Sequence, residues 1–279
     1  MNAMIDTNGI SLRPAVRRRS ALLFFAVTFC ISWAGALALV APRLLAHQPI
    51  PKFTGLMMFP IMLLGPAVAG IALTAQSQGW EGLRALARRM SPLRIPPRWT
   101  TVLLIPPVLM LAVLGGFTLF VSARFTPNHF FVGLGFGIVA GLVEEIGWTG
   151  YAFPALAQPR GALSAAVILG LLWSLWHAPV VDYLGTATPH GRYWLPYFLA
   201  FMAVMTAMRV LICWTYVHTQ SVSLAQLLHA ASTGALVVFS PQVSAGDETL
   251  WYFAYAAVLW CVVAAVVRLD RPAFLRVSE

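Results

Sequence analysis

Charged residues are scarce in this chain. Only 10% of its 279 residues are Asp, Glu, Lys or Arg, and 59% are hydrophobic. A soluble domain carries about 25% charged residues, so a soluble fold could not hide this much apolar surface. Uncharged runs of about 20 residues, the length that a helix needs to cross a membrane, recur along the chain. We therefore expect an integral membrane protein.

Cysteine pairs and the common catalytic signatures are also missing. Cys30, Cys213 and Cys261 lie in apolar runs without a CxxC spacing, so they indicate neither a disulfide framework nor a thiolate metal site. The chain has no H-E-x-x-H, no G-x-S-x-G, no P-loop and no Gly-rich dinucleotide fingerprint. Zincin, serine-esterase and nucleotide-binding functions therefore lack their defining spacings. Unusual hydrolases and transporters remain as candidate classes of function.

The apolar runs predict the fold class. Bounded by Pro, Gly and charge, they indicate an all-α membrane protein of about eight transmembrane helices. The expected spans lie near residues 21–40, 55–75, 100–121, 130–149, 163–181, 195–216, 222–240 and 250–267. Between the second and third spans, Trp80 to Arg98 has apolar and basic faces, which favours an amphipathic helix at the lipid interface over a solvated basic loop.

The basic residues serve as topology signals. The net charge of +9 does not form a stripe with interleaved aromatics, so no nucleic-acid partner is expected. An even number of spans places both termini on one side, where thirteen of the 18 basic residues then lie, against four on the other. By the positive-inside rule, the N and C termini are expected to be cytoplasmic, in a multi-pass protein of the cell membrane that contacts membrane lipid.

The domain organisation is expected to be simple. Residues 1–14 read as a disordered N-terminal tail, residues 15–270 as a single polytopic membrane domain, and residues 271–279 as a C-terminal tail. No internal repeat is apparent, whereas transporters of this size usually have related halves. A proton-coupled transporter is therefore the weakest of the functional hypotheses.

The candidate site begins with two adjacent carboxylates. Glu144 and Glu145 are the only acidic residues well within an apolar run. Side by side in a low-dielectric medium they repel each other and lose hydration, so at least one should exchange a proton near neutral pH. Because they diverge by about 100° on a helix, one can face a cavity while the other holds a neighbouring helix. A pair that only bridges helices is the alternative.

Two histidines in predicted spans complete the candidate site. His177 and His229 are each more typical of packing residues when taken alone, but beside the glutamate pair they gain a second interpretation. Two imidazoles and one carboxylate can hold a catalytic zinc with a position open for water. The same groups can activate water without a metal. If a metal is used, Glu144, His177 and His229 are its expected ligands, with zinc the expected ion.

These residues lie in three motifs that resemble those of the CAAX-protease and bacteriocin-processing (CPBP, or Abi) family of intramembrane proteases. Glu144-Glu145-Ile-Gly-Trp-Thr149 is similar to the family's E-E-x-x-x-R motif. Trp173 to His177 is similar to F-x-x-x-H, and His229 to Thr233 to H-x-x-x-N. The resemblance covers a motif core of residues 130–233, with all three motifs in order.

The resemblance implies a function and residue roles. It implies an intramembrane endopeptidase, glutamate- or metal-dependent, that hydrolyses a peptide or membrane-protein substrate, lipidated or not. Glu144 and His177 would activate water, and His229 and Thr233 would stabilise the oxyanion. Two departures, Thr149 for arginine and Thr233 for asparagine, favour the alternative of a catalytically silent membrane binding protein or bacteriocin self-immunity protein. A threonine hydroxyl donates one hydrogen bond where an amide donates two.

One basic residue lies inside a predicted span. An unpaired charge such as that of Arg209 costs at least about 2.5–3.5 kcal/mol at the bilayer centre. Glu145 is its expected partner, because Thr149 leaves that carboxylate without the family's arginine. The alternative is that Arg209 extends to the cytoplasmic interface and binds lipid phosphate.

Overall fold

A computed structural model describes residues 14–91, 95–181 and 190–275. Every regular element in these ranges is helical. The α-helices are α1 (Pro14–Leu45), α2 (Lys52–Arg89), α3 (Ile105–Phe120), α4 (Gly133–Gly147), α5 (Phe153–Arg160), α6 (Ala162–Trp176), α7 (Trp194–Thr219), α8 (Val222–Phe239), α9 (Ala245–Leu269) and α10 (Arg271–Leu275). A 3-10 helix, η2 (Pro97–Leu104), leads into α3, and a π-helix, η4 (Trp148–Ala152), joins α4 to α5.

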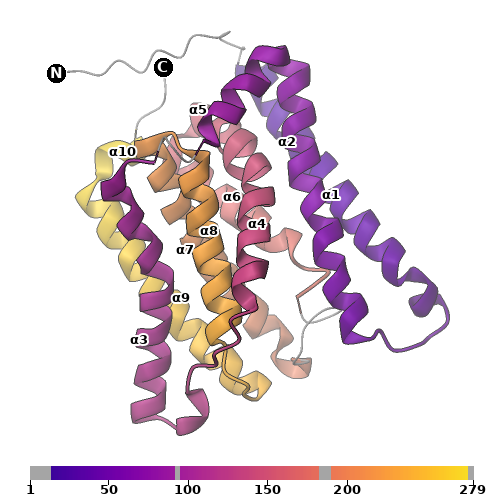
Figure 1. The fold of residues 1–279 in the computed structure, drawn as a ribbon, viewed down its shortest axis with the longest axis vertical. Coiled ribbons are helices and arrows are strands. Elements are labelled where there is room, and N and C mark those ends of the chain that lie inside the picture. Colours follow the sequence, from indigo (N-terminus) through magenta and orange to yellow (C-terminus); the bar gives the residue numbers. More distant parts are fainter. Residues whose placement is uncertain (1–13, 92–94, 182–189, 276–279) are drawn as a thin grey trace.

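The predicted all-α membrane fold is confirmed. Each of the eight expected spans coincides with a helix, and among the described residues six helical segments are long and apolar enough to cross a membrane. The other two spans correspond to α4 and α6, which have 15 residues each. These two shorter helices carry the glutamate pair and lead to His177. In Figure 1, α1 begins and α9 ends at the same end of the bundle, as an even number of spans requires.

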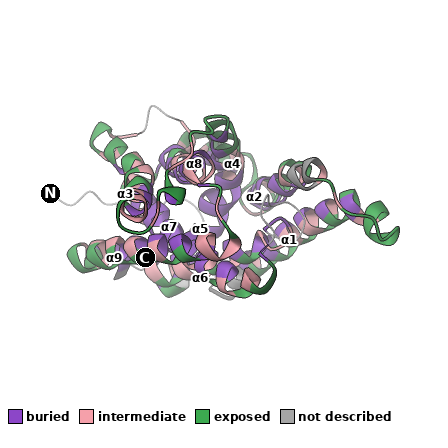
Figure 2. Ribbon diagram, turned by 90° about the horizontal axis from the view of Figure 1, so that it is seen from below, coloured by how far each residue is buried: buried purple, intermediate pink, exposed green. Residues whose placement is uncertain are grey.

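Helix α7 lies at the centre of the bundle. In the most apolar stretch of the segment that contains α7, 72% of the residues are buried. The corresponding share is 22% for the segment that contains α3 and 33% each for α1 and α9. It packs against α6, α8 and α9. Figure 2 shows the same arrangement, with buried residues gathered in the middle and exposed residues on the outer faces of α3 and α9. A polar side chain on α7 is therefore shielded from lipid.

Helices α4 and α8 approach closely along a row of glycines. A Cβ atom on Gly137 would lie 2.5 Å from the Ala230 carbonyl oxygen, and one on Gly141 would lie 2.3 Å from that of Gln226. Small residues allow membrane helices to come this near, because lipid provides no hydrophobic drive and close van der Waals packing must hold them together. This contact places the carboxyl-terminal end of α4 beside α8, which carries His229.

The segment after the second span is helical, in line with the amphipathic pattern, but it is not a separate element. Helix α2 runs on to Arg89 with one break at Gly79, whose φ of 62° and ψ of −154° are essentially reserved for glycine. Beyond the break, Leu86 is buried against the bundle and Arg88 is exposed. At Leu86, the apolar face of this segment therefore contacts protein. The stretch from Pro97 is part of the 3-10 helix η2.

The C-terminal residues differ from the expectation of a tail. Residues 271–275 form α10, in which Ala273 and Phe274 are 1% and 4% exposed. The helix packs against α6, α7 and α9, because the apolar Phe274 side chain has a place in the core. Most of the predicted N-terminal tail, residues 1–13, and residues 276–279 lie outside the described residues.

The glycine contact between α4 and α8 can be tested with two substitutions on one helix. Gly137→Ala should lower the free energy of unfolding by about 1–3 kcal/mol, because its Cβ meets backbone atoms of α8 that cannot move aside. Gly135→Ala is the matched control, since a Cβ there meets nothing within 4 Å. Thermal unfolding of the purified protein in detergent measures both. Equal stability of the two variants would contradict the close approach.

Candidate active site

The Glu145 carboxylate is bonded through both of its oxygens inside the bundle. Its Oε2 accepts hydrogen bonds from Arg209 Nη1 at 2.8 Å and from the Thr149 hydroxyl, and its Oε1 lies 2.7 Å from His229 Nδ1. Both charged side chains, Glu145 and Arg209, are 0% exposed. The predicted pairing of Arg209 with Glu145 is thus confirmed. The alternative that Arg209 extends to the interface is wrong, because the central position of α7 shields it from lipid.

Arg209 of α7 supplies the positive charge that is missing at position 149, which lies in η4 directly after α4. Its guanidinium also lies over the Trp173 ring, 4.0 Å from the ring centroid, where the negative face of the indole attracts a cation. Thr149 is fully buried, and its side chain is shorter than the arginine of the family's motif. Its hydroxyl donates a hydrogen bond to Glu145. The departure from the family's motif at residue 149 is therefore compensated within this chain.

Glu144 has different surroundings from its neighbour. Its Oε2 accepts hydrogen bonds from two indoles, Trp148 Nε1 at 3.0 Å and Trp173 Nε1 at 2.8 Å. Its Oε1 receives no hydrogen bond from any residue in the described ranges. No ion pair to a described cation holds the Glu144 carboxylate, although only 2% of the residue is exposed. One oxygen of Glu144 is thus fixed and the other is available to a reactant.

Both histidines are held through Nδ1. His177 ends α6, and its Nδ1 lies 2.8 Å from the Trp173 carbonyl oxygen. His229, on α8, has its Nδ1 beside Glu145 as described above. A carbonyl oxygen only accepts a hydrogen bond, and so does a carboxylate, so we assign the proton of each ring to Nδ1. In the neutral form each Nε2 then carries a lone pair that can take a proton.

Trp173 connects the groups that the sequence analysis proposed. It donates to Glu144, and its ring centroid lies 4.9 Å from that of His229 and 5.6 Å from that of His177. The distance between the centroids of the two imidazole rings therefore cannot exceed the sum of their two distances from the Trp173 centroid. Sequence reasoning aligned Trp173 only as the aromatic residue of the second motif. Its position four residues before His177 was the signal that it lies on the same face of the helix.

Thr233 is not joined to this network. It is partly exposed on α8 and makes no hydrogen bond with the described part of the chain. It lies one helical turn after His229, so it shares that face of α8. The structure brings together Glu144, Glu145, His177 and His229. Thr233 lies outside this cluster.

The residues do not form a ready metal site. The Nδ1 bonds of His177 and His229 are of the kind that orients metal-binding imidazoles. Among the described residues, however, no three His, Cys, Asp or Glu side chains are close enough together to hold a metal ion. The donor chemistry suits a metal, whereas the spacing of the donors does not.

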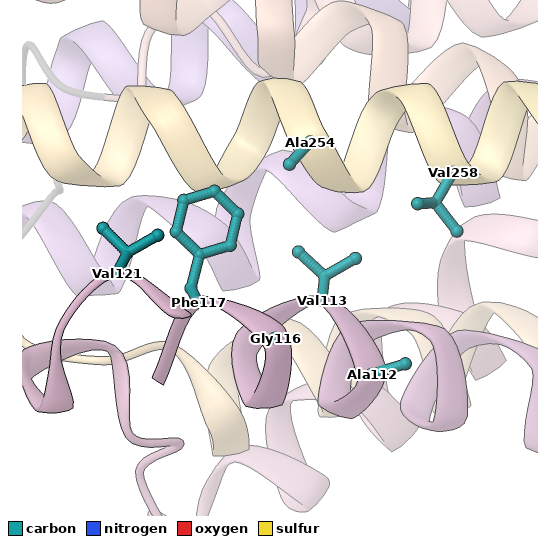
Figure 3. Close-up of a pocket in the computed structure, with 7 residues that line it drawn as sticks. All are labelled: Ala112, Val113, Gly116, Phe117, Val121, Ala254 and Val258. Carbon is teal, nitrogen blue, oxygen red and sulfur yellow. The ribbon is translucent and has the colours of Figure 1, made fainter. Parts of the chain in front are cut away.

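A hollow elsewhere in the bundle has a different character. It lies between α3 and α9, with a volume of about 390 Å³, and it shares no residue with the glutamate and histidine cluster. Figure 3 shows Val113 and Phe117 of α3 facing Ala254 and Val258 of α9 across it. All of its lining residues are apolar or glycine, so it contains no group that can transfer a proton.

Two comparisons with known proteins concern this region. Residues 126–235 match the sequence model of a family described as type II CAAX prenyl endopeptidase Rce1-like. The match contains all three motifs. The chain is also 26% identical over 235 residues to a protein of Methanococcus maripaludis named CAAX prenyl protease 2, an alignment that covers 76% of this chain and 81% of the relative.

The ion pair generates a test of stability. Arg209→Ala should lower the free energy of unfolding by about 3–5 kcal/mol, because it leaves the Glu145 carboxylate buried without a cation. Adding Thr149→Arg should recover part of this loss, since it returns a guanidinium four residues from Glu145. Thermal unfolding in detergent of the single and double variants measures the coupling. Simply additive effects would contradict a shared partner.

Proposed function

We propose that this chain belongs to the CPBP family of CAAX-protease-like intramembrane proteins and that it is an endopeptidase that hydrolyses peptide bonds within the membrane. The family match of residues 126–235 and the similarity to the relative from M. maripaludis support this proposal. One observation carries the assignment of the site: a single side chain, Trp173, contacts Glu144, His177 and His229. Three groups able to move protons thus lie around one indole in the interior of the bundle.

In the proposed reaction Glu144 and His177 activate the attacking water. Trp148 and Trp173 fix Oε2 of Glu144, so the unbonded Oε1 is the oxygen that accepts a proton from water. His177 presents Nε2 as a second acceptor, because its Nδ1 is bonded to the Trp173 carbonyl oxygen. The proton taken from water then passes to the leaving amine, which completes the hydrolysis.

His229 and Thr233 are proposed to stabilise the oxyanion of the tetrahedral intermediate. The Glu145 carboxylate compensates the charge of an imidazolium at His229, which in that form presents Nε2–H to an oxyanion. Arg209 and Thr149 keep Glu145 in place throughout, so Glu145 acts as a positioning residue. Thr233, on the same face of α8, can add one hydroxyl donor.

Zinc has no step in this proposal, because the described donors are not grouped around one point. If zinc does take part, Glu144, His177 and His229 would have to move together to hold it, and it would polarise the carbonyl and the water. Dialysis of the purified protein against a chelator would then remove turnover, and added zinc would restore it. Turnover that survives chelation supports water activation by the chain's own residues.

The substrate is proposed to be a peptide or a membrane-protein segment, lipidated or not. The relative from M. maripaludis is named for prenylated CAAX substrates. A site inside a bundle of membrane-spanning helices suits a substrate that already lies in the bilayer, because a lipid or an apolar segment brings the scissile bond to the site. The runner-up function, a silent binding or self-immunity protein, is favoured only by Thr233, since Arg209 compensates the change at Thr149.

Single substitutions test the proposed roles. Glu144→Gln keeps the shape and the two indole bonds but cannot take a proton, so it should lower kcat by at least about 100-fold. His177→Ala and His229→Ala should have similar effects. The assay is cleavage of prenylated and unmodified peptides by purified protein in lipid. His129→Ala is the control, because this exposed histidine lies outside the site.

Two outcomes would contradict the assignment. Turnover by Glu144→Gln near the rate of the unchanged chain would show that another group activates water. A substituted chain that no longer enters the membrane would show that the residue serves folding. A variant in which Cys30, Cys213 and Cys261 are replaced should keep its activity, since none of the three cysteines makes a hydrogen bond to a described site residue.

A further inference from the structure

The helix that carries both carboxylates widens directly after them. The π-helix η4 (Trp148–Ala152) interrupts the path from α4 to α5, and the Phe153 N–H donates to the Trp148 carbonyl oxygen, five residues back. The sequence explains this turn. Pro154 has no N–H, and in a regular α-helix its ring would collide with the carbonyl group of Gly150. A wider turn relieves that collision, and such turns often occur at functional sites.

A residue distant in sequence provides the donor that Pro154 lacks. Arg89 Nη2 donates to the Gly150 carbonyl oxygen at 3.0 Å, and Arg89 Nη1 donates to the Tyr216 hydroxyl of α7 at 2.5 Å. We call residues 80–89, the part of α2 after the break at Gly79, the interfacial arm. Leu86 of the arm packs on the same turn, since a Cβ on Gly150 would lie 2.8 Å from its Cδ1.

The π-helix in turn holds both carboxylates. Trp148 donates to Glu144, and Thr149 donates to Glu145. On its other side, Tyr151 bonds to the Ser20 hydroxyl and stacks on Phe24 of α1 at 5.6 Å. The turn is thus held from α1, from α7 through Arg89, and from the interfacial arm. Of these contacts, only that of Arg89 satisfies the carbonyl group that the proline leaves without its usual donor.

We propose that Arg89 is a positioning residue for the reaction proposed above. By donating to Gly150 it keeps the π-helix in the form that places Trp148 on Glu144 and Thr149 on Glu145. The interfacial arm is then part of the catalytic apparatus although it touches neither carboxylate. Loss of Arg89 leaves a buried carbonyl group short of a donor, and the turn must rearrange to satisfy it.

The experiment compares Arg89→Ala with Arg88→Ala, which removes the same charge from an exposed neighbour. Amide hydrogen exchange of residues 144–153 is measured in both purified variants, together with kcat and KM. Arg89→Ala should speed exchange in this segment and lower kcat about tenfold, with KM nearly unchanged, because the substrate still binds. Arg88→Ala should match the unchanged chain. Arg89→Lys, which keeps the charge and donors, should recover part of kcat.

A proline variant tests whether the effect of Arg89 depends on the N–H that Pro154 lacks. Pro154→Ala returns the missing N–H to the helix, so in that background Arg89→Ala should change exchange far less. If Arg89→Ala does not fold, Tyr216→Phe, which removes the acceptor that anchors Arg89, takes its place and should shift exchange and kcat in the same direction.

The outcomes separate this proposal from the proposed function. Exchange in residues 144–153 equal to that of Arg88→Ala would overturn the role of Arg89, and so would faster exchange with kcat unchanged. An equal effect of Arg89→Ala with and without Pro154 would also overturn it. If the unchanged chain cleaves no peptide, the proposed endopeptidase activity fails, and the positioning role fails with it even where the exchange results show that Arg89 holds the turn.

Discussion

A buried ion pair between Arg209 and Glu145 is the constraint on which the rest of the site depends. Neither charge could remain alone at this depth in an apolar bundle. Each therefore requires the other, and together they require α7 and α4 to keep one relative position. His229 joins the same carboxylate from α8, so one group fixes three helices. The central position of α7 follows naturally, because only a helix shielded on most sides can carry an arginine here.

The two adjacent glutamates divide their tasks because the helix turns them into different environments. Glu145 faces a cation, a hydroxyl and an imidazole, which occupy both of its oxygens. Glu144 faces two indoles that hold one oxygen without neutralising its charge. A carboxyl group with one unbonded oxygen can still accept a hydrogen bond or a proton, whereas one bonded through both oxygens is held in place. In the proposed reaction, two adjacent residues of a single helix thus provide a support, Glu145, and a reactive group, Glu144.

Much of this arrangement could be predicted from the sequence. The features that could not be predicted depend on contacts between distant parts of the chain. Hydropathy placed the spans, because membrane helices must be apolar along their length. The partner of Arg209 could be inferred because Glu145 was the only buried carboxylate left for it. The role of Trp173 could not, because an indole on an apolar helix is compatible with simple packing. The α10 helix and the contact of Arg89 with Gly150 depend on which helices meet, and local patterns carry no record of that.

The π-helix also affects how the rest of its own chain is aligned. A π turn holds one residue more than an α turn, so it is equivalent to a single-residue insertion within a continuous helix. Every residue of α5 is rotated by about 100° relative to a helix without it. In this rotated frame, Phe153 and Leu156 are buried. Removal of one residue between Trp148 and Ala152 would preserve a helix but turn these side chains away from the core, so the length of this segment is constrained as well as its composition.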